Sequence, residues 1–176
     1  YFESADLPKA ELTHLLRRQP GRLDVQREAE QLWHNGNRLP AACDTTFEAW
    51  RQAGYMTDEQ VFERVRLAME RRNLSLAERL GQYLAPRERV WINRWLAMHR
   101  DPARELASFK YPVETPVARA IVRHGVVRLA YNDPDVAMQE WARLKTLHSF
   151  FGEDDSYVLR WVGLLASSSR PTARSV

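Results

Sequence analysis

Proline and helix-capping residues interrupt this chain at short intervals, and between them apolar residues recur with helical spacing. Proline is tolerated in the first turn of a helix but not in its interior, and Ser, Thr and Asp commonly cap the first turn. Each interruption therefore predicts a helix start, and about ten short helices follow from this pattern. The predicted starts lie at Pro8, Asp24, Pro40, Thr57, Ser75, Pro86, Pro102, Thr115, Asp133 and about Asp154.

The predicted helices are amphipathic, and short links join them. In the third, Cys43, Phe47 and Trp50 are spaced by four and three, which places them on one face. There are only 7 Gly, and Ala, Leu, Arg and Glu, which favour helix, are abundant. Short helices with tight links predict an all-α fold in which short antiparallel helical hairpins stack into an α-solenoid or superhelix.

The distribution of charged and apolar residues argues against a nucleic-acid partner and against a membrane span. The 26 basic and 23 acidic residues leave a net charge of +3, and the two signs are interspersed along the sequence. A nucleic-acid binder would need its basic residues gathered on one face, so no nucleic-acid partner is predicted. No stretch approaches the roughly 18 consecutive apolar residues of a membrane span, so no span is predicted either.

Sequence motifs of catalysis are not found. There is no Gly-rich phosphate loop and no nucleophile elbow, and the five histidines form no metal-ligand motif. We therefore predict no catalytic, cofactor-binding or metal-binding residue. The acidic run Glu153 to Asp155 is interpreted as a helix start, where the helix dipole favours negative charge.

One aromatic and basic stretch has two interpretations. Trp91, Arg94 and Trp95 lie on the helix predicted to begin at Pro86. Aromatic rings beside arginine can stack on bases or sugar rings. However, Trp91 and Trp95 also share a face with Met98, and this spacing favours a ridge that packs against another helix. Trp33, Trp50, Trp141 and Trp161 likewise fit the apolar stripes of their helices.

Cys43 is the only cysteine in the chain. Its spacing from Phe47 and Trp50 fits a small core residue. A nucleophile and one half of a disulfide are the alternatives, although no histidine lies near it in sequence.

Two stretches resemble a known family. They read LPAACDTTFEAWRQAG, from Leu39, and VFERVRLAMERRNLSLAERL, from Val61. They are similar to the amino-terminal superhelical (U-shaped) domain of the soluble lytic murein transglycosylases. The matching residues are Ala42, Cys43, Asp44, Phe47, Trp50, Arg51, Arg66, Leu67, Ala68, Met69 and Asn73. The resemblance is specific over residues 22 to 84 and collinear but weaker to about 170.

The resemblance implies a periplasmic enzyme that cleaves the β-1,4 bond between N-acetylmuramic acid and N-acetylglucosamine in peptidoglycan, as a lyase that forms a 1,6-anhydro product. In the family, a separate lysozyme-like domain carries the catalytic Glu. That domain's Glu-Ser pair with its Gly-Leu-Met-Gln stretch is absent here, so this chain alone is expected to be an inactive scaffold. Its expected partners are glycan strands and the missing catalytic domain, with Arg94, Trp91 and Trp95 as weak candidates for glycan contact.

The resemblance also sets the expected domain limits. Residues 1 to 170 correspond to part of the superhelical scaffold, and residues 171 to 176 are expected to form a tail or linker. The family has further residues where this chain has Pro20-Gly21, so we predict a missing segment near residues 20 to 22. In the family, a cysteine in that segment pairs with the counterpart of Cys43, which suits an oxidising periplasm. The alternative to this whole interpretation is a stand-alone helical-repeat module that binds other proteins.

Overall fold

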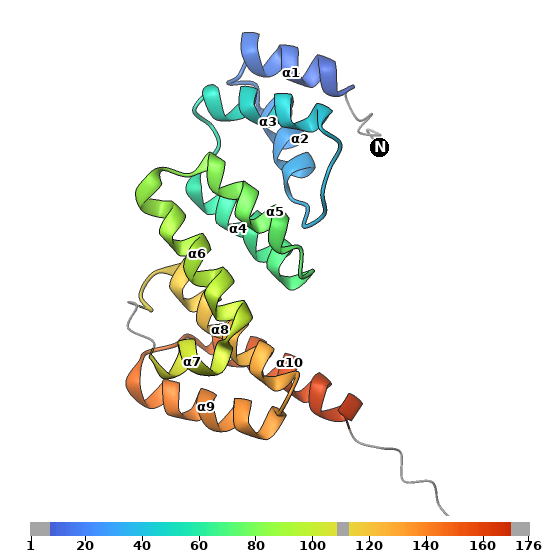
Figure 1. Cartoon of the computed structure of the whole chain (residues 1–176). Helices are drawn as coiled ribbons and strands as arrows, with labels where there is room; N and C mark the ends of the chain where they lie inside the picture. Colours follow the sequence, from blue (N-terminus) through green and yellow to red (C-terminus); the bar gives the residue numbers. More distant parts are fainter. Residues whose placement is uncertain (1–7, 109–112, 170–176) are drawn as a thin grey trace, which may run out of the picture. The chain divides into compact units, whose positions relative to one another are not determined.

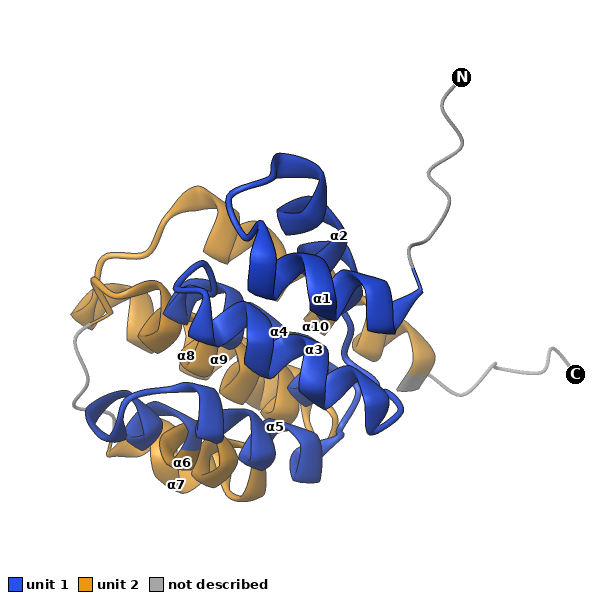
Figure 2. Cartoon of the chain, turned by 90° about the horizontal axis from the view of Figure 1, so that it is seen from above, with its two compact units in different colours: residues 1–92 blue, residues 93–176 orange. Residues whose placement is uncertain are grey.

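The computed structural model describes residues 8–108 and 113–169, and within these ranges the chain forms helices and no strand (Figure 1). The chain divides into two compact units, residues 1–92 and residues 93–176 (Figure 2). Within each unit, short helices pack against one another, so the predicted all-α fold of helical hairpins, the α-solenoid class, is confirmed. No helix in the described ranges is both long enough and apolar enough to cross a membrane.

The first unit consists of a group of three helices, a helical hairpin and the start of a further helix. Helix α1 (Lys9–Arg18) packs on α3 (Ala42–Gln52), and α2 (Leu23–Trp33) contacts both of them. Helices α4 (Asp58–Glu70) and α5 (Leu74–Leu80) form a hairpin, which a short 3-10 turn, η1 (Gly81–Tyr83), extends. The first residues of α6 (Pro86–Arg100) complete the unit.

In the second unit, α8 is the central helix. Helix α8 (Pro116–Ala130) contacts α7 (Pro102–Ala107), α9 (Pro134–Leu147) and α10 (Gly152–Ser169). Its central position explains its composition, because Ile121, Val122 and Val126 are fully buried. Their burial removes apolar surface from water, which is the main favourable contribution to packing of this kind.

Several helices begin where the sequence predicts. Thr57 caps α4 through a capping box, in which its hydroxyl accepts from the Gln60 backbone N–H and the Gln60 side chain accepts from the Thr57 backbone N–H. Thr115 and Asp133 cap α8 and α9, each with a proline at the first helical position. These starts combine a capping side chain with a residue whose backbone already suits a helix, which is why the sequence locates them well.

Two predicted caps are wrong. Helix α2 begins at Leu23, one residue before Asp24, so its N-cap residue is Arg22, and the Asp24 carboxylate pairs with Arg22. Helix α5 begins at Leu74, and its cap is the Asn73 side chain, which accepts from the Leu76 N–H, so Ser75 lies inside the helix. In both places another residue close by had the extended or turn backbone that a cap requires.

The chain turns sharply between α1 and α2. The Arg22 N–H donates to the Gln19 carbonyl at 3.2 Å, and the Gln26 side chain donates to the Pro20 carbonyl. Pro20 and Gly21 thus form a local turn between two packed helices. The missing segment near residues 20 to 22 stays a prediction, and the tail at 171–176 lies outside the described residues.

Gly125 on α8 lies against the Met98 side chain of α6. A Cβ built on Gly125 would lie 2.3 Å from the Met98 sulfur and 3.2 Å from a Leu106 methyl carbon. Met98 is fully buried and cannot simply move aside. We therefore expect Gly125→Ala to lower the free energy of unfolding by about 1 to 3 kcal/mol, as overpacking of a core usually does. Urea denaturation followed by circular dichroism measures this change.

Gly163 provides the matched control. It lies in α10, and no heavy atom comes within 4 Å of a Cβ built on it. Gly163→Ala should therefore leave stability unchanged or raise it by up to about 1 kcal/mol, because Ala favours helix. Equal stability changes in the two variants would contradict the close packing assigned to Gly125.

Candidate functional site

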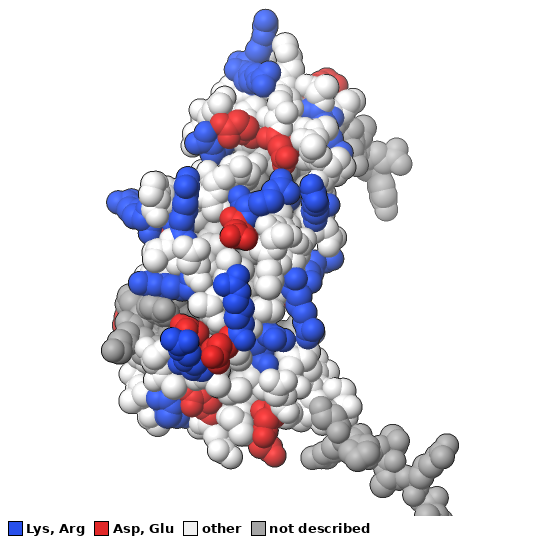
Figure 3. All heavy atoms as spheres, viewed as in Figure 1, with Lys and Arg blue, Asp and Glu red and all other residues white. Residues whose placement is uncertain are grey.

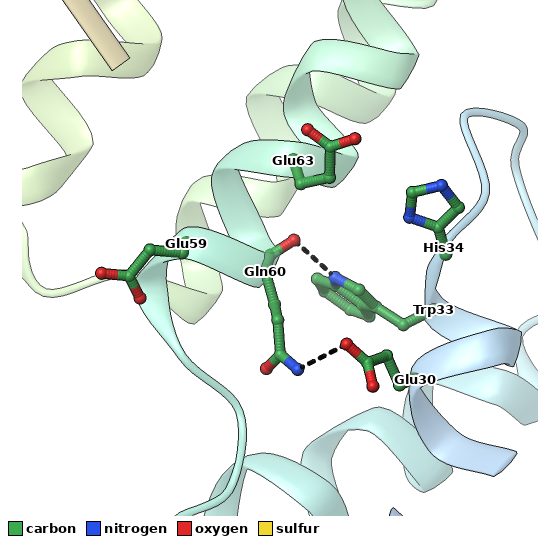
Figure 4. A pocket seen from close by; sticks show the side chains of 6 residues that line it. All are labelled: Glu30, Trp33, His34, Glu59, Gln60 and Glu63. Carbon is green, nitrogen blue, oxygen red and sulfur yellow. Dashed lines mark hydrogen bonds between the residues drawn. The ribbon is translucent and has the colours of Figure 1, made fainter. Parts of the chain in front are cut away.

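A small cavity opens between α2 and α4 in the first unit (Figure 4). Its volume is about 180 Å³, and its lining residues are Glu30, Trp33, His34, Glu59, Gln60 and Glu63. The Trp33 indole N–H donates to the Gln60 carbonyl at 2.8 Å. The Gln60 side-chain amide donates to a Glu30 carboxylate oxygen at 3.3 Å, so the walls of the cavity are cross-linked.

The chemistry of this cavity does not suit a glycan strand. Ligand pockets usually enclose about 300 to 1,000 Å³, and this one is smaller. Three carboxylates line it, and one of them, Glu63, accepts two hydrogen bonds from Arg66 at 2.9 and 2.6 Å. Among the described residues, no group of three or more His, Cys, Asp or Glu side chains is arranged to hold a metal ion. The cavity therefore offers negative charge without a metal site.

The acidic lining could have been noticed in part from the sequence. Glu30 and His34 are four residues apart on one helix, and Glu59 and Glu63 are four apart on another. Such spacing places each pair on a common helix face. However, the contact between α2 and α4 is tertiary, and no sequence motif reveals it.

The three predicted glycan-contact residues lie in different environments on α6. Trp95 is only 1% exposed, and its ring meets the His124 ring edge-on at 6.3 Å. Trp91 and Arg94 are half-buried. Because its side chain is inside the core, Trp95 presents almost no surface to a ligand, whereas Trp91 and Arg94 remain accessible. Met98 is also fully buried, so the expected packing ridge runs through Trp95 and Met98.

Cys43 lies in the core of the first unit. Cys43, Phe47 and Trp50 are each at most 1% exposed, so the predicted common face of α3 is the buried face. The thiol is free. Burial of this kind suits a small core residue, and the pairing with a cysteine of a missing segment stays a prediction.

Comparison with known proteins gives two different matches. A family profile described as Cucumovirus coat protein matches residues 19–116. Viral capsid domains of the jelly-roll type consist of β-strands, whereas the described part of that range forms helices and no strand. The fold therefore gives the coat-protein match no support.

The second match agrees with the fold. Soluble lytic murein transglycosylases from Salmonella typhimurium and Escherichia coli K12 are 27% and 26% identical over 109 residues, which is 62% of this chain. A solved structure of an inactive mutant of lytic transglycosylase Slt from Pseudomonas aeruginosa superposes with a TM-score of 0.78 and 28% identity, covering 90% of this chain. The chain is therefore similar in sequence and in fold to soluble lytic murein transglycosylases.

The similarity is to the amino-terminal region of these transglycosylases. It spans 17% of the two curated transglycosylases and 26% of the solved Slt chain. The family resemblance predicted from the stretches around Cys43 and Arg66 is thus confirmed.

A pair of stacked histidines is buried in the second unit. The His99 Nδ1 and His124 Nε2 atoms are 2.9 Å apart, and the two rings stack with their centroids at 5.2 Å. Each residue is 8% exposed. Burial, and then the nearby His99, lower the pKa of His124 to about 3. His124 is therefore neutral in the folded protein throughout the neutral and mildly acidic range.

This lowered pKa predicts a loss of stability in acid. Below pH 6.5 the unfolded chain takes up a proton on His124 that the folded protein excludes until about pH 3. Stability should fall by about 2 kcal/mol between pH 8 and pH 5 because of this residue. Urea titrations at the two pH values measure it. His124→Gln should make the free energy of unfolding depend less steeply on pH. The control His14→Gln changes an exposed histidine and should leave the slope unchanged. A slope in His124→Gln as steep as in wild type would contradict the assignment to His124.

Proposed function

We propose that this chain is part of the helical scaffold of a periplasmic lytic transglycosylase. The parent enzyme would cleave the β-1,4 bond between N-acetylmuramic acid and N-acetylglucosamine in peptidoglycan and form a 1,6-anhydro product. The observation that carries the proposal is the structural similarity to Slt, which extends over 90% of this chain at 28% identity. Similarity over nearly the whole chain supports a shared role for the region as well as a shared fold.

In this proposal the chain binds murein and performs no chemistry. Glycoside cleavage by carboxylates needs an acid/base group held against the scissile bond in a cleft. The one cavity described above is small and acidic, and a catalytic Glu-Ser motif with its Gly-Leu-Met-Gln stretch is not found in these 176 residues. The catalytic acid/base would therefore come from another part of the longer protein.

The proposed contact with glycan involves Trp91 and Arg94 of α6. An indole ring can pack against the apolar face of a sugar, and a guanidinium group can donate to its hydroxyl or carboxylate oxygens. Both side chains are partly accessible, unlike Trp95. Their positions three residues apart bring them close together on the helix surface.

Retention on purified insoluble peptidoglycan tests this proposal. We expect the wild-type protein to sediment with peptidoglycan and to release no soluble 1,6-anhydro-muropeptides, as measured by mass spectrometry. The double variant Trp91→Ala and Arg94→Gln should bind several-fold more weakly, whereas Trp161→Ala, which changes a tryptophan on α10, should bind like wild type. Absence of sedimentation would refute the binding role, and release of anhydro products would refute the non-catalytic role.

A further inference from the structure

An excess of positive charge lies in one segment of the first unit. Residues 71–89, called here the arginine segment, contain five Arg and two Glu and no other charged residue. The segment runs from the end of α4 through α5 and η1 into α6. All five arginines are exposed: Arg71, Arg72, Arg79, Arg87 and Arg89. Figure 3 shows that Lys and Arg outnumber Asp and Glu on the visible surface over α5 and α6.

The positive charge of this segment is only weakly compensated within the protein. Arg71 donates to the Asn37 side-chain amide at 3.0 Å, and Arg89 donates to the Leu84 carbonyl at 3.1 Å, so both acceptors are neutral. Arg79 lies 3.7 Å from an Asp44 carboxylate oxygen, and the Arg87 side chain, which is 87% exposed, pairs only with its neighbour Glu88 at 3.2 Å. Exposed pairs of this kind hold their partners loosely.

Other arginines of the same unit are engaged far more fully. Arg66 donates to both carboxylate oxygens of Glu63 and also to Glu70 at 2.5 Å. Arg51 donates to both carboxylate oxygens of Glu48, at 2.9 and 2.6 Å. Arg51 and Arg66 are therefore held by carboxylates at shorter distances than Arg79 is, and Arg71 and Arg89 donate to neutral acceptors instead.

The surroundings of these arginines favour carboxylates as the ligand. The one aromatic residue of the segment, Tyr83, packs edge-on against Trp33 at 5.1 Å and offers no platform for stacking bases. Leu76, Leu80 and Leu84 are buried and Leu74 is half-buried, so the segment presents little apolar surface to a membrane. Exposed guanidinium groups that lack a stacking ring and a large apolar surface beside them suit planar carboxylate groups. They can bind such groups with two parallel hydrogen bonds.

We propose that the arginine segment binds the carboxylates on the peptide side chains of murein. The inference rests on the proposed function, and it adds that recognition in this region is directed at charged peptide groups rather than at sugar rings. It extends the proposed contact with murein beyond Trp91 and Arg94 to the arginine segment next to them. Because the arginines are exposed, this contact is screened by salt and weakens as ionic strength rises.

Two matched double variants test the inference. Arg87→Gln with Arg89→Gln removes two charges from the arginine segment. Arg17→Gln with Arg18→Gln removes two charges that are also exposed, from α1. The first variant should bind purified murein about fivefold more weakly at low salt, from two exposed charge contacts, and the second should bind like wild type. The double variant loses the hydrogen bond from Arg89 to the Leu84 carbonyl, whereas the single variant Arg87→Gln keeps it. Weaker binding by the single variant therefore cannot come from loss of that hydrogen bond.

The second test uses murein whose carboxylates have been converted chemically to neutral amides. Wild-type protein should bind amidated murein as weakly as the Arg87 and Arg89 variant binds native murein. If wild type binds native murein but neither amidation nor the Arg87 and Arg89 changes weaken it, the inference is wrong and the proposed function stands. If wild type does not bind native murein at all, both fail. Duplex DNA that binds wild type more tightly than native murein would assign the segment to phosphates and overturn the inference.

Discussion

Asp154→Asn is expected to lower the free energy of unfolding by about 3 kcal/mol, because it breaks a buried ion pair on one side only. The Asp154 side chain is 1% exposed, and its carboxylate lies 2.9 Å from Arg123 Nη1 and 3.7 Å from Arg119 Nε. It also accepts from the Phe151 N–H at 2.9 Å, at the start of α10. Without its charge, two half-buried guanidinium groups on α8 lose their counter-ion.

The control for this substitution is Asp135→Asn. Asp135 is exposed in the first turn of α9, so its charge interacts mainly with the helix dipole. Its loss should cost at most about 1 kcal/mol. Urea denaturation of both variants at pH 7 gives the comparison. A loss for Asp154→Asn no larger than that for Asp135→Asn would show that α10 is not held to α8 by this ion pair.

Trp33→Ala should be at least as damaging, with an expected loss of about 4 kcal/mol. Trp33 is 2% exposed, and its ring lies 4.8 Å from Phe47 and 5.1 Å from Tyr83 in edge-on contacts. The Arg64 guanidinium, which is 3% exposed and whose pKa burial lowers, lies 4.4 Å above the same ring. Removing the indole leaves a large cavity and a buried cation without the ring that faces it.

Trp161→Ala is the matched control, because Trp161 is 37% exposed on α10. Truncating this partly exposed ring removes less buried surface than truncating Trp33, so the expected loss is smaller, about 1 to 2 kcal/mol. Thermal and urea denaturation of the two variants should separate them clearly. Similar losses from both substitutions would contradict the assignment of Trp33 to the centre of the first unit's core.

The sequence predicted the helices well because their determinants are local. Proline at a first helical turn, the capping box at Thr57 and the apolar spacing of Cys43, Phe47 and Trp50 each act within a few residues. The errors also have a local cause. Asp24 and Ser75 had the right side chains for a cap, but Arg22 and Asn73 occupied the required backbone position.

Features that depend on contacts between distant residues were not predictable in the same way. The acidic run Glu153 to Asp155 lies in the first turn of α10, as predicted. The ion pairs of Asp154 with Arg119 and Arg123, more than thirty positions earlier, could not be predicted from this pattern. Trp161 fits an apolar stripe but is 37% exposed, and its ring contacts Tyr157 on its own helix. Periodicity identifies an apolar face, and only the tertiary fold decides whether another element covers it.

The central claim is that these residues form a scaffold region of a longer lytic transglycosylase. The most direct test is to determine the complete coding sequence that contains them. The claim predicts that the same open reading frame encodes a lysozyme-like domain with a catalytic Glu-Ser pair and its Gly-Leu-Met-Gln stretch. An open reading frame that ends without such a domain would contradict it and favour a stand-alone helical module.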